Sequence, residues 1–108
     1  MELLTKEILE EFKRQGNCEN KEAKDIKIIC KFFNPTGQGT WYAYQYHPEE
    51  RIFDGFVSIF GDECDEAGPF SLDELESLEL PAGLGIERDI NFKPGSCTLQ
   101  DLFDGKRP

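Results

Sequence analysis

The sequence predicts an α+β fold: an antiparallel sheet of about four strands, with helices on one face of the sheet or at its ends. Helical capping patterns occur at the start of the chain and near residues 71–79. Between them, three segments with a two-residue apolar period are joined by turns too short for parallel crossovers. A chain of 108 residues with 38% hydrophobic residues is also long enough to form one core, so we expect a single domain over 1–108.

The first helix is expected to begin after Thr5. A threonine side chain can accept a hydrogen bond from the first helical turn, which makes Thr5 a suitable N-cap. Leu4 and Leu9 have the spacing of a hydrophobic staple around that cap. Gly16 can end the helix, because glycine readily adopts the left-handed backbone of a helix C-terminus.

The strands are expected in the next third of the chain. Residues 26–33, IKIICKFF, alternate in the manner of a strand with one buried face. The sequence NPTGQG is typical of a turn, and TWYAYQYH at 40–47 follows it as a second strand. RIFDGFVSIF at 51–60 is the third strand, after the turn HPEE. Three consecutive strands with short turns predict an antiparallel meander.

A second helix is predicted near 71–79. Ser71 and Glu74 form an S-x-x-E capping box, and Pro81 is expected to end the helix. Its buried stripe is expected to consist of three leucines: Leu72, Leu75 and Leu78.

The remaining segments are short. GIERDINF at 85–92 is predicted to be a fourth strand, broken by Pro94 and Gly95. Thr98 is positioned to cap a last helical turn, LQDLF.

The aromatic run TWYAYQYH raises the question of which face is buried. In a regular strand Trp41 and Ala43 share one face, and Tyr42, Tyr44 and Tyr46 share the other. We expect the tryptophan face in the core, since three tyrosines can keep their hydroxyls in water. The tyrosine face then either packs across strands or forms a binding platform.

The charge is unevenly distributed. The formal net charge is −10, and residues 52–87 contain ten acidic residues and no Lys or Arg. Such a segment repels phosphate, so we expect no direct binding to DNA or RNA. It is either a solvated surface or a recognition surface for a basic protein partner. Its candidate binding residues are Asp62, Glu63, Asp65 and Glu66.

The candidate catalytic group is Glu87, Arg88 and Asp89. On a strand the two carboxylates share a face, where one of them can acquire a raised pKa and act in general acid–base catalysis. The same three residues can instead stabilise the fold through ion pairs with Lys31 or Lys93. The sequence leaves both roles open.

Other chemistry is not indicated. The four cysteines lack metal-ligand spacing, the acidic segment does not match a calcium-binding loop, and no phosphate-binding glycine loop occurs. His47 adjoins Pro48 without a nucleophile motif beside it. We therefore expect no metal and no cofactor. The N-terminus has no basic segment and no apolar run reaches membrane-spanning length, so we expect a cytoplasmic protein without membrane contact.

The chain resembles a small bacterial family known as domain of unknown function 2958. The resemblance rests on TWY at 40–42, FSLDELES at 70–77 and GLGIERD at 83–89, and it extends over nearly the whole sequence. Members of this family occur on plasmids, phages and other mobile elements, with no catalytic activity established for the class. The resemblance therefore implies an intracellular, mobile-element setting and supplies no mechanism.

Two hypotheses follow. We favour a non-catalytic protein-binding or accessory module of a mobile element, acting in counter-defence or as a nucleic-acid mimic through its acidic segment. The alternative is a small hydrolase-like enzyme that uses Glu87 and Asp89.

Overall fold

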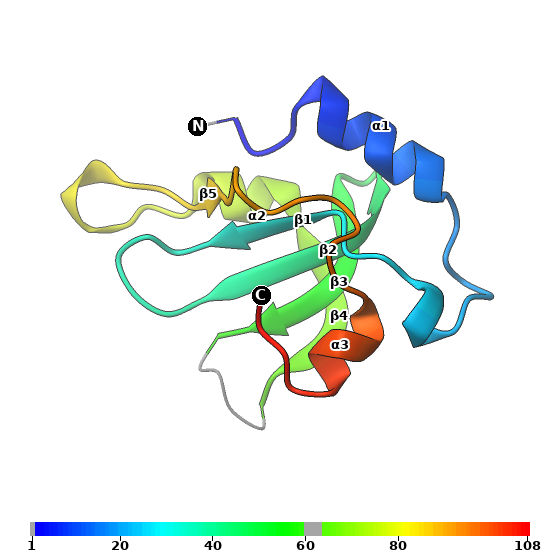
Figure 1. The fold of residues 1–108 in the computed structure, drawn as a ribbon. Coiled ribbons are helices and arrows are strands. Elements are labelled where there is room, and N and C mark those ends of the chain that lie inside the picture. Colours follow the sequence, from blue (N-terminus) through cyan, green and yellow to red (C-terminus); the bar gives the residue numbers. More distant parts are fainter. Residues whose placement is uncertain (1, 60–63) are drawn as a thin grey trace.

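The computed structural model describes residues 2–59 and 64–108, and over these residues the sheet has five strands in the order β4-β3-β2-β1-β5 (Figure 1). Each neighbouring pair is antiparallel. The strands are β1 (Cys30–Phe33), β2 (Thr40–His47), β3 (Ile52–Ser58), β4 (Glu66–Ser71) and β5 (Glu87–Arg88). The predicted α+β class with an antiparallel sheet is confirmed.

The three α-helices all begin at the predicted caps. In α1 (Lys6–Gln15) the Thr5 hydroxyl accepts a hydrogen bond from the Ile8 amide at 3.3 Å, and in α2 (Leu72–Ser77) the Ser71 hydroxyl accepts one from Glu74 at 3.2 Å. In α3 (Leu99–Phe103), Thr98 and Asp101 form a reciprocal capping box. The short polar caps therefore fix where each helix starts.

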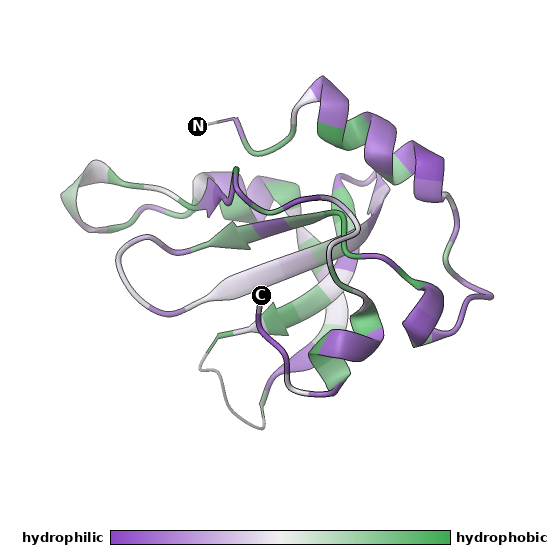
Figure 2. Ribbon diagram, viewed as in Figure 1, coloured by the Kyte–Doolittle hydropathy of each residue, from purple (hydrophilic) through white to green (hydrophobic). Residues whose placement is uncertain are grey.

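Hydrophobic clusters lie on both faces of the sheet, so the helices cover two faces rather than the one face or the ends that we expected. The first cluster joins α1 and α2 to the sheet through Phe12, Phe32, Phe53 and Leu75. The second cluster contains Tyr42, Phe56, Leu99 and Leu102, and lies under α3. α1 and α3 accordingly lie on opposite sides of the sheet, and α1 is hydrophilic over most of its length (Figures 1 and 2).

A β-bulge in β2 changes which tyrosines share a face. Ala43 pairs with Gly55 and Gln45 pairs with Asp54, so Tyr44 is an extra residue between them. Tyr42 and Tyr44 therefore pack with the second cluster, whereas Tyr46 packs with the first. The expectation of three tyrosines on one face is wrong.

The tryptophan face is a core face, as predicted, although not in full. Ala43 is completely buried, and Trp41 is partly buried against the first cluster. The expectation that Tyr42 keeps its side chain in water is wrong, since it is 1% exposed. Because the sheet is covered on both sides, both faces of β2 contribute to the core.

Other boundaries also differ from the sequence-based expectation. Strand β4 was not expected, because Glu66, Gly68 and Pro69 are poor strand residues, yet an edge strand tolerates proline. The predicted strand 26–33 is divided: Ile26 and Ile28 belong to the second cluster, and regular pairing with β2 begins at Cys30.

Helix α2 is shorter than predicted. It ends at Ser77, four residues before Pro81, so the proline does not itself end the helix. Leu72 and Leu75 are buried as expected, but Leu78 follows the helix in extended backbone and is 43% exposed.

Candidate functional site

Arg88 in β5 is occupied by contacts within the fold. Its guanidinium donates hydrogen bonds to the backbone carbonyls of Glu2 and Leu3, both at 2.9 Å. These bonds attach the segment before α1 to the edge of the sheet. Arg88 therefore has a structural role in the position where the sequence suggested a catalytic one.

The two carboxylates beside Arg88 do not converge on one cleft. A cleft of 290 Å³ is lined by Arg88 and Asp89 together with Glu7 and Glu11 of α1, and Glu87 is not among its lining residues. Asp89 lies 3.8 Å from the ammonium of Lys31. The ion pair with Lys31, one of the two alternatives left open by the sequence, is present.

The tyrosines of β2 lie in three different environments. The Tyr42 hydroxyl donates a hydrogen bond to the carbonyl oxygen of Pro108 at 3.2 Å, and burial raises the pKa of Tyr42 to about 12. Tyr44 lines a polar cleft next to Asp54, and Tyr46 lines an apolar cleft next to Phe12. The structure therefore does not bring Tyr42, Tyr44 and Tyr46 together as an exposed platform.

The acidic segment is only partly at the surface. Asp62 and Glu63 lie outside the described residues. Glu66 is exposed at the start of β4, whereas the side chain of Asp65 is only 4% exposed and lies 3.0 Å from Arg107. Asp65 thus points into the molecule, toward a cation of the same chain.

A cluster of acidic residues that the sequence did not place together lies where the β2–β3 turn meets α2. Arg51 contacts Asp73 at 2.7 Å and Glu76 at 3.0 Å, and its carbonyl accepts a hydrogen bond from the Leu72 amide at 2.9 Å. We call this surface the acidic end, and its five carboxylates belong to Glu49, Glu50, Asp73, Glu74 and Glu76, all exposed.

Two of the five carboxylates of the acidic end, those of Asp73 and Glu76, pair with the Arg51 guanidinium. Glu49 and Glu50 precede the basic-free segment 52–87, so its charge count did not include them. The sequence does not reveal that the turn contacts α2. This contact places the two glutamates of the turn on the same surface as the acidic residues of α2.

A cleft of 580 Å³ contains a histidine–aspartate pair. The Nε2 atom of His47 lies 2.6 Å from Asp54 Oδ2, and Cys18 and Tyr44 line the same space. The Cys18 thiol, however, donates to the Gly16 carbonyl at 3.6 Å, and burial raises its pKa. A protonated thiol hydrogen-bonded to backbone is a weak nucleophile.

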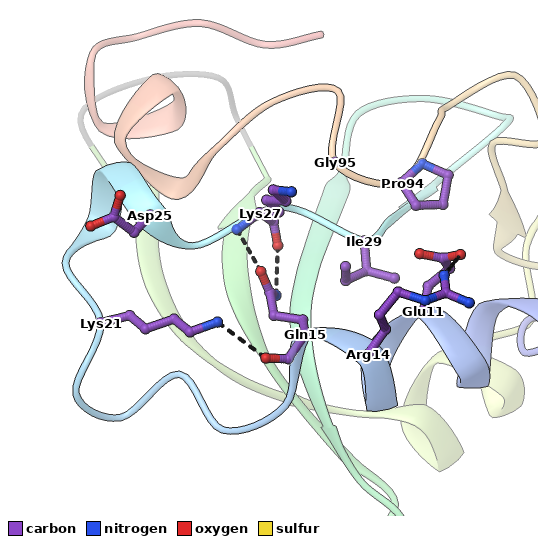
Figure 3. Close-up of a pocket in the computed structure, with 9 residues that line it drawn as sticks. All are labelled: Glu11, Arg14, Gln15, Lys21, Asp25, Lys27, Ile29, Pro94 and Gly95. Atoms are coloured by element: carbon purple, nitrogen blue, oxygen red, sulfur yellow. Dashed lines mark hydrogen bonds and ion pairs between the residues drawn. The ribbon is translucent and has the colours of Figure 1, made fainter.

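A further cleft, of 320 Å³, lies between the end of α1 and the segment that leads into β1 (Figure 3). Gln15 is at its centre: its amide donates to the carbonyls of Lys27 and Tyr44 at 2.9 and 2.7 Å, and its oxygen accepts from the Lys27 amide at 2.8 Å. Lys21 donates to the Gln15 carbonyl, and Arg14 pairs with Glu11. Most of the charged groups in Figure 3 are thus used in internal contacts.

Among the described residues, no three His, Cys, Asp or Glu side chains gather as they would around a metal ion. Within the same part of the chain, no helix combines the length and apolar character needed to cross a membrane.

Comparison with curated proteins and with solved structures gave no match. The model of the family described as "Protein of unknown function (DUF2958)" matches residues 3–101 of the 108-residue chain. The match includes every strand and helix of the fold except the last two residues of α3. The chain therefore belongs to the DUF2958 family.

Proposed function

We propose that this protein is a non-catalytic binding module that docks a basic protein partner through the acidic end. The observation that carries the proposal is that Arg51, which follows Glu49 and Glu50 in the turn, is joined to α2 by two ion pairs and a backbone hydrogen bond. Carboxylates held on a fixed scaffold present a defined pattern of charge, which mobile side chains on a loop would not.

The acidic end suits association with a cationic surface. A local excess of negative charge steers a basic partner and raises its association rate at low salt. The partner class that fits is a protein whose Lys and Arg residues otherwise hold nucleic acid, because such a surface already recognises an array of negative charges. This is the chemistry expected of a cytoplasmic accessory protein of a mobile element that acts as a nucleic-acid mimic.

The hydrolase-like alternative has less support. It requires Glu87 and Asp89 to share a site, yet Glu87 does not line the cleft that Asp89 lines, and Asp89 lies beside Lys31. Two of the hydrogen bonds that Arg88 donates go to the backbone carbonyls of Glu2 and Leu3.

The test compares two variants of equal charge. One carries Glu49→Gln, Glu50→Gln and Glu74→Gln, which removes three charges from the acidic end and keeps Asp73 and Glu76 on Arg51. The control carries Glu2→Gln, Glu10→Gln and Glu19→Gln, three exposed residues elsewhere on the surface. Both are used as immobilised baits for proteins of the host bacterium.

We expect the wild type and the control to retain the same basic protein, which salt elutes, and the acidic-end variant to retain much less of it. Equal retention by both variants would overturn the proposed docking surface. Retention of no basic protein by the wild type would overturn the proposed function as a whole.

A further inference from the structure

The chain builds an arginine site on the second face of the sheet and fills that site with its own Arg107. The guanidinium of Arg107 donates two hydrogen bonds to one oxygen of Asp65, at 3.0 and 3.2 Å, and another to the Leu102 carbonyl at 2.7 Å. It also lies over the Phe56 ring, 4.8 Å from the ring centre. A carboxylate, a carbonyl and an aromatic face are the three groups that recognise a planar guanidinium.

The carboxylate of Asp65, which accepts these hydrogen bonds, is buried in the fold rather than exposed at the surface. Asp65 is 4% exposed in its side chain, and the Ser58 hydroxyl donates to the same oxygen at 2.7 Å. Ser58 is itself buried at the end of β3. The carboxylate is thus oriented before any arginine arrives, which reduces the entropic cost of binding one.

The segment that supplies Arg107, residues 104–108, is attached to α3 through the amides of Asp104, Gly105 and Lys106 and through the ion pair of Lys106 with Asp101. All five residues of 104–108 are exposed, and none belongs to a helix or strand. Gly105 turns this strap with a φ of 92°. Beyond Arg107, the Lys31 ammonium and the Tyr42 hydroxyl donate hydrogen bonds to the carbonyl oxygen of Pro108, at 2.9 and 3.2 Å.

Space remains beside the strap. A cleft of 310 Å³ is lined by Arg107, Lys31, Tyr42, Ser58 and Ile59. The exposed ring of Phe103, 51% exposed, lies 6.0 Å from Phe56 on the same face. A longer peptide that placed an arginine in the site would therefore find further polar and aromatic groups next to it.

We propose that this site recognises an arginine side chain of a protein partner and that the strap 104–108 occupies it as an internal competitor. The inference rests on the proposed function, since it names the chemistry of the basic partner. A tethered competitor acts at an effective concentration on the order of millimolar, so an arginine in trans must displace it. The apparent affinity then falls by the fraction of molecules in which the site is open.

The test uses a peptide with the strap's own sequence, acetyl-Gly-Lys-Arg-Pro-amide, and a matched peptide with Lys in place of Arg. Binding is measured by calorimetry and by NMR for the wild type, for Arg107→Ala, and for Arg107→Ala combined with Asp65→Asn. Free arginine is a third ligand, which separates recognition of a peptide from capture of an amino acid. The NMR spectrum of each variant also reports whether its fold is intact.

We expect Arg107→Ala to bind the arginine peptide at least about ten-fold more tightly than the wild type does. The lysine peptide and free arginine should each bind about ten-fold more weakly, because an ammonium cannot make the paired contacts and a free amino acid lacks the backbone contacts. Adding Asp65→Asn should abolish binding of the arginine peptide.

Failure of a folded Arg107→Ala protein to bind the arginine peptide would overturn the inference. Equal binding by the wild type would overturn the role of the strap. If Arg107→Ala does not fold, Arg107→Lys takes its place, since lysine keeps the charge but not the guanidinium fork, and the same gain in affinity is expected.

These outcomes are separable from the proposed function. The peptide assay needs no host partner. The arginine site is also unaltered in the acidic-end variant, which carries Glu49→Gln, Glu50→Gln and Glu74→Gln. Arg107→Ala combined with these three substitutions should therefore still bind the arginine peptide. If the wild type and Arg107→Ala/Asp65→Asn retain a basic partner equally, the proposed binding function is supported. The same result would show that the arginine site is not part of the interface.

Discussion

At the scale of single residues, Gly55 is the position at which the sheet tolerates least change. It lies opposite Ala43, beside the bulge between β2 and β3. A Cβ atom there would overlap the carbonyl oxygen of Tyr42 and lie 2.8 Å from the Phe70 ring. Only a residue without a side chain fits this approach of two backbones.

We expect Gly55→Ala to destabilise the protein by about 3 kcal/mol, the upper end of the usual range for overpacking. The matched control is Gly68→Ala, because Gly68 pairs with Gly55 across β3 and β4 but has open space around it, and its cost should be within about 0.5 kcal/mol. Urea unfolding measures both. Similar losses for the two variants would show that strand propensity, not the bulge contact, sets the requirement for glycine.

The cysteines give a second test at this scale. Cys18, Cys30 and Cys97 are buried, and burial raises the pKa of each thiol, to about 11 for Cys97. Cys64 is exposed. We expect a thiol reagent at neutral pH to label Cys64 quickly and the other three only after denaturant is added. Mass spectrometry of labelled peptides would identify the sites, and rapid labelling of Cys18 would contradict the buried, protonated thiol.

The sequence also predicts individual residues unequally. The caps Thr5, Ser71 and Thr98 were predictable because each acts on its own helical turn, a local effect. The faces of Tyr42 and Tyr46 were not, since a single inserted residue at Tyr44 reverses the alternation and nothing in TWYAYQYH marks the bulge.

At the scale of elements, α3 offers a test that depends on pH. The Asp101 carboxylate accepts a hydrogen bond from the Thr98 amide at 2.9 Å, and this bond, followed by contact with Lys106, lowers the pKa of Asp101. A carboxyl group whose pKa is lower in the folded state stabilises the fold above its unfolded pKa, and this stabilisation is lost as the pH falls through the folded value.

We expect Asp101→Asn to be less stable than the wild type at neutral pH, with the difference shrinking as the pH falls below about 4, the pKa of an aspartate in the unfolded chain, toward the lower pKa of folded Asp101. Denaturant unfolding at a series of pH values measures the gap. A gap that stays constant down to about pH 2 would show that the charge of Asp101 is not what the capping box uses.

Elements differ in how well the sequence predicts them. The helices and the meander β1–β2–β3 were predictable, because caps, apolar periods and short turns are local signals. Strand β4 was missed because its sequence, EAGPFS, gains its strand conformation from pairing with β3 rather than from its own propensity. The same dependence on tertiary contacts hid the acidic end, where the turn that carries Glu49 is joined to α2 through Arg51 and Asp73.

At the scale of the whole molecule, the formal net charge of −10 opposes binding to nucleic acid. We expect no measurable affinity for duplex DNA or for RNA at moderate salt, since phosphate contacts need Lys and Arg and the excess here has the opposite sign. A gel-shift titration with labelled duplex and single-stranded RNA tests this. Retardation that weakens as salt rises would mean that a local basic surface outweighs the overall charge.

The arrangement of the whole molecule also explains why a binding function is proposed at its surface. Both faces of the sheet are covered, and Arg88 and Asp89 make contacts within the fold, so much of the aromatic and charged character of the sequence is used internally. The two surfaces proposed above for a partner are the acidic end and the carboxylate of Asp65, which Arg107 contacts.

The most direct test of the central claim is the association rate constant of the captured basic partner, measured at low and high ionic strength. The wild type, the acidic-end variant Glu49→Gln, Glu50→Gln, Glu74→Gln and the control Glu2→Gln, Glu10→Gln, Glu19→Gln are compared. The account predicts association about ten-fold slower for the acidic-end variant at low salt, little change for the control, and convergence of all three at high salt. Equal association rates for the wild type and the acidic-end variant at low ionic strength would contradict it.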